Sequence, residues 1–168
     1  AACNRRCAVW YARATGACSD EATRDMAAGE WAGVFDQASG LGVSFIILAG
    51  GEPLLRRDVI ELASQYKDMI FPIFTNGTMI DDEYIQLFEQ NRNLIPVFSI
   101  EGDEQMTDER RGEGAHAAVA KAMALLKQKG VLFGASITVT KANMQHVSGE
   151  TFVGEIRDNG CGVVFYVE

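Results

Sequence analysis

Gly50, Gly51, Glu52 and Pro53 form a short motif directly after residues 43–48, an apolar and uncharged run. Such a run is typical of a strand that is buried on both faces. The two glycines allow positive φ angles and a close approach of another group to the backbone, and Pro53 disfavours helix at the residue before it. We therefore expect Glu52 just beyond the carboxyl end of a buried strand, which is where parallel α/β folds place their chemistry. An ordinary turn between a strand and a helix could have the same residues.

The cysteines are the second group that could do chemistry: Cys3, Cys7 and Cys18 lie near the start of the chain and Cys161 near its end. Cysteine thiolates are ligands for zinc and for iron–sulfur clusters. These cysteines are too few and too unevenly spaced for a disulfide scaffold or for a closed zinc site with four cysteines. We expect a reducing compartment, the cytoplasm. Cys3 and Cys7 are then either metal ligands or two free thiols, and Cys18 and Cys161 are interpreted as packing residues.

The composition is that of a globular domain, with 168 residues of which 48% are hydrophobic and 23% charged. A chain of this length can bury one sizeable core. The formal net charge of −8 argues against a nucleic-acid-binding surface. No apolar run has the length of a membrane span, and Asn4 and Arg5 interrupt any signal-peptide core at the start. We therefore expect neither a nucleic acid nor a membrane as a partner.

Apolar runs and amphipathic segments alternate along the chain. The runs have the length of strands, and the amphipathic segments carry apolar residues at helical spacing. Asp81 is a candidate N-cap, and the polar stretch 103–114 is predicted to be a loop. Strands are expected at 43–48, 69–74, 94–100, 131–139 and 162–167, and helices at 30–40, 57–66, 81–90, 115–129 and 149–158.

This alternation predicts an α/β fold with a parallel sheet and right-handed crossovers. The polar, glycine-containing loops follow strands, whereas the loops before strands are short. The asymmetry predicts one functional face at the carboxyl ends of the strands. A closed eight-stranded barrel needs about 250 residues, so we expect either a partial barrel or a doubly wound sheet.

Several motifs resemble, in order and spacing, those of the radical S-adenosylmethionine (radical SAM) superfamily. Its fingerprint is C-x3-C-x2-C after the first strand and G-G-E-P after the second, similar to the segments that begin at Cys3 and Gly50. Further motifs are similar to those of the SPASM-type branch, which carries peptide-modifying and cofactor-building enzymes. These are Ser99-Ile100-Glu101-Gly102, Arg110-Arg111-Gly112-Glu113-Gly114, and Thr138-Val139-Thr140 with Asn143. Thr75-Asn76-Gly77-Thr78 resembles the T-N-G that usually follows the third strand throughout the superfamily.

The resemblance implies a partial (β/α)6 TIM-type barrel of parallel strands that is open on one side. The first strand of that barrel is missing here, because the cysteine segment stands at the start of the sequence. Residues 1–168 are therefore expected to be a single core domain and a fragment of a longer chain.

The resemblance also implies two cofactors, a [4Fe–4S] cluster held by three cysteine thiolates and S-adenosylmethionine bound to the remaining iron. One electron from the reduced cluster cleaves S-adenosylmethionine to a 5′-deoxyadenosyl radical, which abstracts hydrogen from a substrate. The further partners are an electron donor and an unknown substrate, for which a peptide is a candidate. The cofactors carry the reaction, so we predict no catalytic side chain.

By the resemblance, Cys3 and Cys7 are cluster ligands, but residue 10, where the third cysteine belongs, is Trp. An indole offers only an N–H donor and cannot ligate iron. Cys18 is a candidate stand-in, although its distance along the chain from Cys7 requires a different loop. Two alternatives remain open. One is a degenerate relative without a cluster that acts as a binding or partner domain, and the other is an α/β scaffold without a small-molecule site.

The remaining site residues are implied for S-adenosylmethionine. Gly50 and Gly51 admit its amino group to the backbone, and Glu52 accepts a hydrogen bond from that group or fixes the loop. Arg111 suits its carboxylate, because a guanidinium offers a fork of donors. The predicted cofactor-binding residues are Gly50, Gly51, Glu52, Pro53, Asn76 for the methionine pocket, Ser99 and Glu101 for the ribose hydroxyls, Arg111, and Ser136 near the carboxylate.

Overall fold

The structure is a computed structural model that describes residues 2–5, 7 and 25–168, and a parallel sheet lies at its centre. In this described part of the chain, four strands lie side by side in the order β1-β2-β3-β4. Each neighbouring pair is parallel, which confirms the predicted α/β fold with parallel strands. The strands are β1 (Phe71–Thr75), β2 (Leu94–Ile100), β3 (Gly134–Thr138) and β4 (Val163–Val167).

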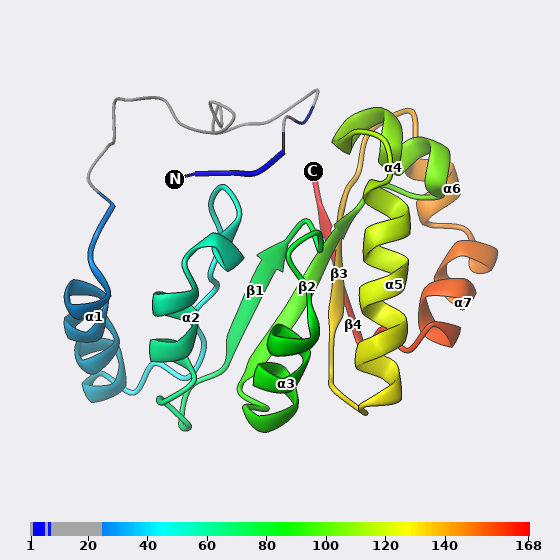
Figure 1. The fold of residues 1–168 in the computed structure, drawn as a ribbon. Helices are drawn as coiled ribbons and strands as arrows, with labels where there is room; N and C mark the ends of the chain where they lie inside the picture. Colours follow the sequence, from blue (N-terminus) through cyan, green and yellow to red (C-terminus); the bar gives the residue numbers. More distant parts are fainter. Residues whose placement is uncertain (1, 6, 8–24) are drawn as a thin grey trace.

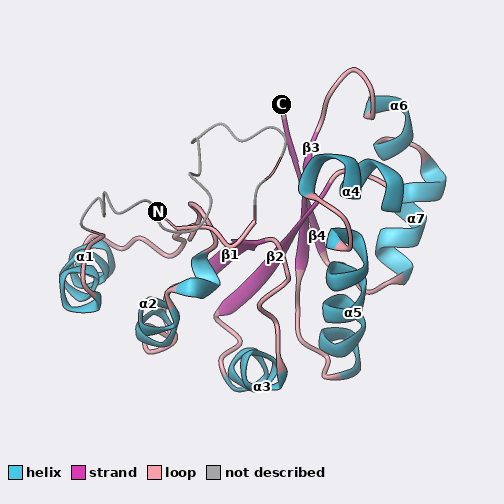
Figure 2. Ribbon diagram, turned by 45° about the horizontal axis from the view of Figure 1, so that its top comes forward, coloured by secondary structure: helices cyan, strands magenta, loops and turns pink. Residues whose placement is uncertain are grey.

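Helices connect the strands and lie along one side of the sheet (Figure 1, Figure 2). Asp81 caps α3 as predicted, because its carboxylate accepts a hydrogen bond from the N–H of Tyr84 at 2.9 Å. No helix in the described ranges is long and apolar enough to cross a membrane. The helices are α1 (Ala28–Gly40), α2 (Arg57–Ala63), α3 (Asp82–Gln90), α4 (Glu104–Arg111), α5 (Ala115–Gln128), α6 (Met144–Val147) and α7 (Glu150–Asp158), and η1 (Pro53–Leu55) is a 3-10 turn.

The predicted strand at 43–48 is wrong as a regular strand, and Pro72 in β1 supplies the reason. The segment lies parallel to β1 but forms only two isolated bridges, Phe45 with Ile70 and Leu48 with Ile73. Two backbone hydrogen bonds hold each bridge, with N···O distances between 2.8 and 3.0 Å. A regular ladder between the bridges requires the backbone N–H of residue 72, which proline lacks. The segment therefore has the position of a strand without its continuous pairing.

The predicted loop at 103–114 is also wrong, because most of it forms α4. Asp103 caps this helix by accepting a hydrogen bond from the N–H of Met106 at 2.9 Å, and Gly112 ends it with a φ of 96°. Only Thr107 and Arg111 of the helix are buried. Its sequence therefore lacks the apolar stripe by which a helix is predicted. The short α6 is not predicted from the sequence either.

The core lies between the sheet and the helices, and aromatic residues dominate it. Phe71 in β1 and Phe98 in β2 are fully buried. The ring of Phe35 in α1 is also fully buried and meets Phe71 edge-on, with 5.1 Å between the centroids. Burial of one such side chain stabilises a fold by about 1.5–3 kcal/mol. The packed helices thus hold the sheet in place and leave the carboxyl ends of its strands for other contacts.

The sheet is strongly curled, as the rings of Phe74 and Phe165 show. Phe74 lies in β1 and Phe165 in β4, with two strands between them, yet their ring centroids are 5.3 Å apart. Adjacent strands are about 4.8 Å apart, so a flat sheet would separate these rings by about 14 Å. Gly134 in β3 lies on this face and lets β4 pack closely, because a Cβ there would come within 2.7 Å of Val163. The sheet therefore has a concave face on the side away from the helices.

Candidate functional site

Glu52 follows the two glycines and is 2% exposed. Its Oε1 accepts hydrogen bonds from the N–H of Leu54 at 3.1 Å and from the hydroxyl of Thr75 at 2.7 Å. Its Oε2 accepts one from the N–H of Asn76 at 2.8 Å. Burial raises the pKa of the Glu52 carboxyl, and the three hydrogen bonds oppose that effect. The carboxylate thus joins its own turn to the loop after β1.

The turn itself has two further supports. Gly50 has a φ of 151°, which an L side chain rarely adopts. Pro53 begins η1, and the buried hydroxyl of Tyr84 donates to the carbonyl of Leu54 at 2.5 Å. Burial raises the pKa of Tyr84 to about 12, so the phenol stays a donor over the whole neutral range. No sequence pattern reveals this role of Tyr84, because the contact depends on how α3 packs against the turn.

The first described residues cross above the carboxyl ends of the strands (Figure 1). The carbonyl of Ala2 accepts a hydrogen bond from the N–H of Glu52 at 2.8 Å. The side-chain amide of Asn76 donates to Asn4 at 2.9 Å, and the oxygen of the same amide accepts from the N–H of Thr78 at 3.0 Å. Asn76 therefore holds the cysteine segment next to its own loop.

Cys3 and Cys7 lie in this segment, and both thiols are free. Cys3 is buried and Cys7 is half-buried. Burial raises the pKa of the Cys7 thiol, and Cys3 adds to that effect while the cations of Arg111, Arg5 and Arg110 oppose it. Arg5, which lies between the two cysteines in the chain, donates to the carbonyl of Arg111 at 3.0 Å, so the cysteine segment is attached to the backbone of Arg111.

The predictions for Trp10 and Cys18 lie outside the described residues. Within the described residues, no group of three or more His, Cys, Asp or Glu side chains is placed to hold a metal ion. Of the predicted cluster ligands, the described part of the chain includes Cys3 and Cys7.

Glu101 and Arg111 form a buried ion pair directly beyond β2. Their side chains are 3% and 10% exposed, and Nη2 of Arg111 lies 2.5 Å from Oε1 of Glu101. Nε of Arg110 lies 3.4 Å from the same oxygen. Burial raises the pKa of Glu101, and the two arginines oppose that rise. Oε2 of Glu101 and Nε of Arg111 have no hydrogen-bond partner in the described structure, so this pair retains one acceptor and one donor.

Asn143 and Thr107 fix the backbone at this pair. The side-chain amide of Asn143 donates to the carbonyls of Glu101 and Thr138, both at 2.9 Å. The hydroxyl of Thr107 accepts a hydrogen bond from the N–H of Glu101 at 3.1 Å. The sequence signals Asn143 only through its motif, and it gives no signal for Thr107, since α4 is not predicted.

Ser99 and Ser136 are register partners in the neighbouring strands β2 and β3. Ser136 is also the register partner of Phe165, whose ring lies on the concave face. Both serines therefore lie on that face, Ser99 half-buried and Ser136 buried. Ser99 lies one residue before the end of β2 and Ser136 lies within β3. Both are thus farther from the carboxyl ends of the strands than the Glu101–Arg111 pair.

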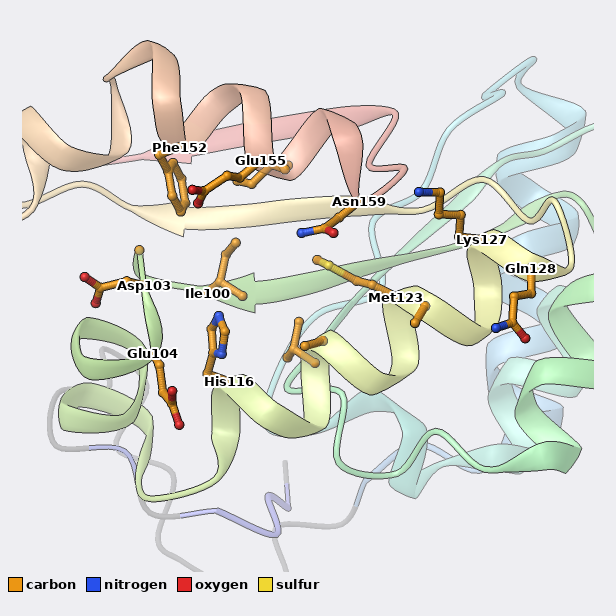
Figure 3. A pocket seen from close by; sticks show the side chains of 15 residues that line it. Ile100, Asp103, Glu104, His116, Met123, Lys127, Gln128, Phe152, Glu155 and Asn159 are labelled. Atoms are coloured by element: carbon orange, nitrogen blue, oxygen red, sulfur yellow. The ribbon is translucent and has the colours of Figure 1, made fainter.

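Two hollows lie near the sheet. One, of about 460 Å³, is lined by Gly50, Gly51 and Glu52 together with Trp31 of α1. The other, of about 430 Å³, lies among the helices, and Figure 3 shows Phe152 of α7 facing α5 across it. None of the predicted site residues lines this second hollow, although Ile100 and Gly102 on either side of Glu101 do.

The family model of the radical SAM superfamily matches residues 1–149. This chain belongs to the radical SAM superfamily. Members of the family bind a [4Fe–4S] cluster and S-adenosylmethionine. The assignment confirms the family resemblance that the motifs at Cys3, Gly50 and Glu101 predict.

Two curated relatives illustrate the branch. An Fe-coproporphyrin III synthase of Methanosarcina barkeri is 29% identical over 148 residues, which cover 86% of this chain and 36% of that protein. A PqqA peptide cyclase of Granulibacter bethesdensis is 27% identical over 122 residues, which cover 70% of this chain and 33% of that protein. The chain thus spans about a third of the length of these relatives. They agree with the predicted SPASM-type branch of peptide-modifying and cofactor-building enzymes.

Solved structures share the fold. Streptococcus suis SuiB bound to the precursor peptide SuiA superimposes with a TM-score of 0.78 at 18% identity, covering 99% of this chain and 37% of that one. The protein anSMEcpe with bound AdoMet and the Cp18Cys peptide gives a TM-score of 0.72 at 22% identity, covering 99% and 48%. At these identities the comparison shows a shared α/β fold with parallel strands and no more than that.

Proposed function

We propose that this chain is the cofactor-binding core of a radical SAM enzyme that abstracts hydrogen from a peptide. When bound, the [4Fe–4S] cluster and S-adenosylmethionine supply reductive cleavage to a 5′-deoxyadenosyl radical, with electrons from a separate donor. The family assignment supports the reaction class. SuiB and anSMEcpe, whose structures contain peptides, support the substrate class. A cluster-free binding domain is not favoured by this assignment.

Cys3 and Cys7 would hold the cluster, since the segment that carries them is attached through Arg5 to the backbone of Arg111 and Gly112. They fit two of the three ligand positions. We propose Cys18 as the third ligand, because Trp10 occupies the family position and an indole cannot ligate iron.

The observation that carries the proposal is the buried Glu101–Arg111 pair with its two unpaired polar atoms. In this role, Nε of Arg111 donates to the carboxylate of S-adenosylmethionine, and Oε2 of Glu101 accepts from a ribose hydroxyl together with Ser99. Ser136 lies on the same face as Ser99 and assists at the carboxylate. Unpaired buried polar atoms cost free energy, so a ligand that satisfies both is strongly favoured.

The glycine turn and the loop after β1 form the other wall. Gly50 and Gly51 present their backbone to the amino group of the ligand, and Pro53 fixes the exit of the turn. Glu52 has the structural role, because protein donors already occupy both of its oxygens. Asn76 shapes the floor of the methionine pocket through its contact with Asn4.

The curled sheet supports a partial (β/α)6 barrel, since the contact of Phe74 with Phe165 closes its concave face. We propose residues 1–168 as a single core domain that acts in the cytoplasm and works with further parts of a longer enzyme. Those further parts would read the substrate.

The test is the affinity for S-adenosylmethionine, measured by calorimetry on the native chain and on Arg111→Lys. Lysine keeps the positive charge next to Glu101 but has no Nε–H, so we expect binding to weaken about tenfold or more. Arg57→Lys is the control, because Arg57 pairs with Glu61 and Glu83 on the surface. Equal affinity in the native chain and Arg111→Lys, or no binding to the native chain, would contradict the proposal.

A further inference from the structure

The residues around and between Cys3 and Cys7 are attached to separate loops of the domain. Ala2 contacts the glycine turn through its carbonyl, which accepts from the N–H of Glu52 at 2.8 Å. Asn4 and Arg5 lie between the cysteines, and their side chains reach two other loops. The attachments are made by backbone groups and uncharged side chains of the domain, so they require neither a metal nor a ligand.

Asn4 uses both ends of its amide. Its oxygen accepts from the amide of Asn76 at 2.9 Å, and its nitrogen donates to the hydroxyl of Thr78 at 2.9 Å. The hydroxyl of Thr78 in turn donates to Asn76 at 2.6 Å, which closes a ring of three side chains. An ionised aspartate at position 4 could not supply the donor, and an apolar residue could supply neither the donor nor the acceptor.

Arg5 binds the end of α4. Its Nη1 donates to the carbonyl of Arg111 at 3.0 Å and to that of Gly112 at 3.2 Å. The last carbonyls of a helix lack partners within the helix and carry its partial negative charge, so a guanidinium there is favourable. Because Arg111 pairs with Glu101 through its side chain, its backbone and side chain together connect Arg5 to the ion pair.

We propose that Asn4 and Arg5 are positioning residues. They dock the cysteine segment on the loop after β1 and on the C-terminus of α4, and so set where both thiols lie relative to the Glu101–Arg111 pair. That this docking aligns the two cysteines with the S-adenosylmethionine site rests on the function proposed above. The docking itself is a property of the metal-free chain.

The burial of the thiols follows from the docking. Cys3 is only 5% exposed and Cys7 is half-buried, although both lie in a short polar segment beside Asn4 and Arg5. Such a segment has little apolar surface of its own to bury, so its hydrogen bonds are the interactions that hold it down.

The experiment measures the alkylation rate of each cysteine in the metal-free chain by peptide mass spectrometry. The variants are Asn4→Leu and Arg5→Met, with Arg5→Lys as the conservative variant. We expect both Cys3 and Cys7 to react about tenfold faster in Asn4→Leu and in Arg5→Met. Each substitution removes hydrogen bonds that hold the segment in place, and their free energy corresponds to a change of about tenfold. Arg5→Lys should give an intermediate rate, since the ammonium keeps the charge and hydrogen-bond donors but lacks the planar guanidinium that fits the two carbonyls.

Arg92→Met is the matched control. Arg92 donates to the carbonyl of Gly130 at 2.7 Å and that of Lys129 at 3.5 Å, so it binds the end of α5 as Arg5 binds the end of α4, away from the cysteines. Its removal should leave Cys3 and Cys7 unchanged. Cys161 is the internal control, and its rate should be the same in Asn4→Leu and Arg5→Met as in the native chain.

Unchanged rates at Cys3 and Cys7 in both Asn4→Leu and Arg5→Met would overturn the proposal. Equal acceleration at Cys161 would also overturn it, because the two residues would then support the whole fold and not the position of the thiols. The measurement needs neither cluster nor S-adenosylmethionine, so a failure of the proposed function would leave its outcome untouched.

Discussion

At the scale of single residues, hydrogen-bond partners separate two roles that residue types alone leave open. Glu52 could bind a ligand or fix its own loop, and three protein donors already engage both oxygens of its carboxylate. Arg111 and Glu101 are the opposite case, since each keeps one unpaired buried atom in the described structure. Among the predicted site residues, this pair is therefore the part of the site best suited to hold a ligand.

Tyr84 gives a prediction about pH at the same scale. Its pKa is raised to about 12 by burial, so the folded chain disfavours the phenolate. The stability that the neutral hydroxyl contributes is complete below pH 10, the value for tyrosine in an unfolded chain, and is lost as the pH rises through about 12.

We expect Tyr84→Phe to lower the free energy of unfolding by about 1 kcal/mol at neutral pH, because the hydrogen bond to Leu54 is lost. In an alkaline titration followed by phenolate absorbance, the same variant should lose the transition near pH 12. Loss of a transition near pH 10 would show that this hydroxyl is not buried as described.

At the scale of elements, one proline decides whether a predicted strand becomes regular. The run at 43–48 has the apolar composition of a strand, and it lies beside β1 with two bridges. Pro72 in the neighbouring strand interrupts the ladder, and this effect cannot be seen in the run itself. The pairing partner of a strand is set by tertiary structure. The composition of residues 43–48 alone is therefore insufficient to predict whether the segment forms a regular strand.

Pro72→Val should therefore make the pairing continuous, with the new N–H donating to the carbonyl of Ile46. Hydrogen exchange should show strong protection of the amide at position 72 and higher protection of Ile46 and Leu48. The free energy of unfolding should change by less than about 1 kcal/mol, because the new hydrogen bond offsets the greater entropy of the unfolded chain. Rapid exchange at position 72 would contradict this account, and Ala135 in β3 serves as the unaffected reference.

The helices show the same limit of sequence analysis. α5 carries an apolar stripe and is predicted, whereas α4 is mostly polar and depends on its Asp103 cap and its contacts with the domain. Because α4 is missed, Arg111 is predicted on a loop although it lies in the last turn of a helix. The motif singles out Arg111, but the contacts that Thr107 and Arg5 make around it are seen only in the structure.

At the scale of the whole molecule, the curl of the sheet brings distant segments to one face. Gly134 is a key position, because a Cβ there would lie 2.7 Å from a side-chain carbon of Val163 and 2.9 Å from its backbone oxygen. We expect Gly134→Ala to lower the free energy of unfolding by about 1–3 kcal/mol, as for other overpacked sites.

Gly154→Ala in α7 is the control for this prediction. No atom lies within 4 Å of a Cβ built there, so alanine should stabilise the helix by about 0.5–1 kcal/mol. Denaturant unfolding of both variants measures the two effects. A neutral Gly134→Ala would mean that β3 and β4 can separate without cost, contrary to the close contact at this face.

The parallel α/β fold and the family are predictable from the sequence because they depend on periodicity and on motifs in order. The curl depends on the contact of Phe74 with Phe165, which are far apart in the chain. The attachment of Asn4 to Asn76 and Thr78 is equally non-local. Such contacts leave no local pattern in the sequence, and they are what turns a set of motif residues into a site.

The most direct test of the proposed function is the iron and sulfide content per chain after anaerobic reconstitution. We expect about four irons and four sulfides, as in a [4Fe–4S] centre. Cys18→Ala should lower this content sharply, while Cys161→Ala should leave it unchanged. Little or no iron in the native chain would contradict the account, and the domain would then have the family fold without the family reaction.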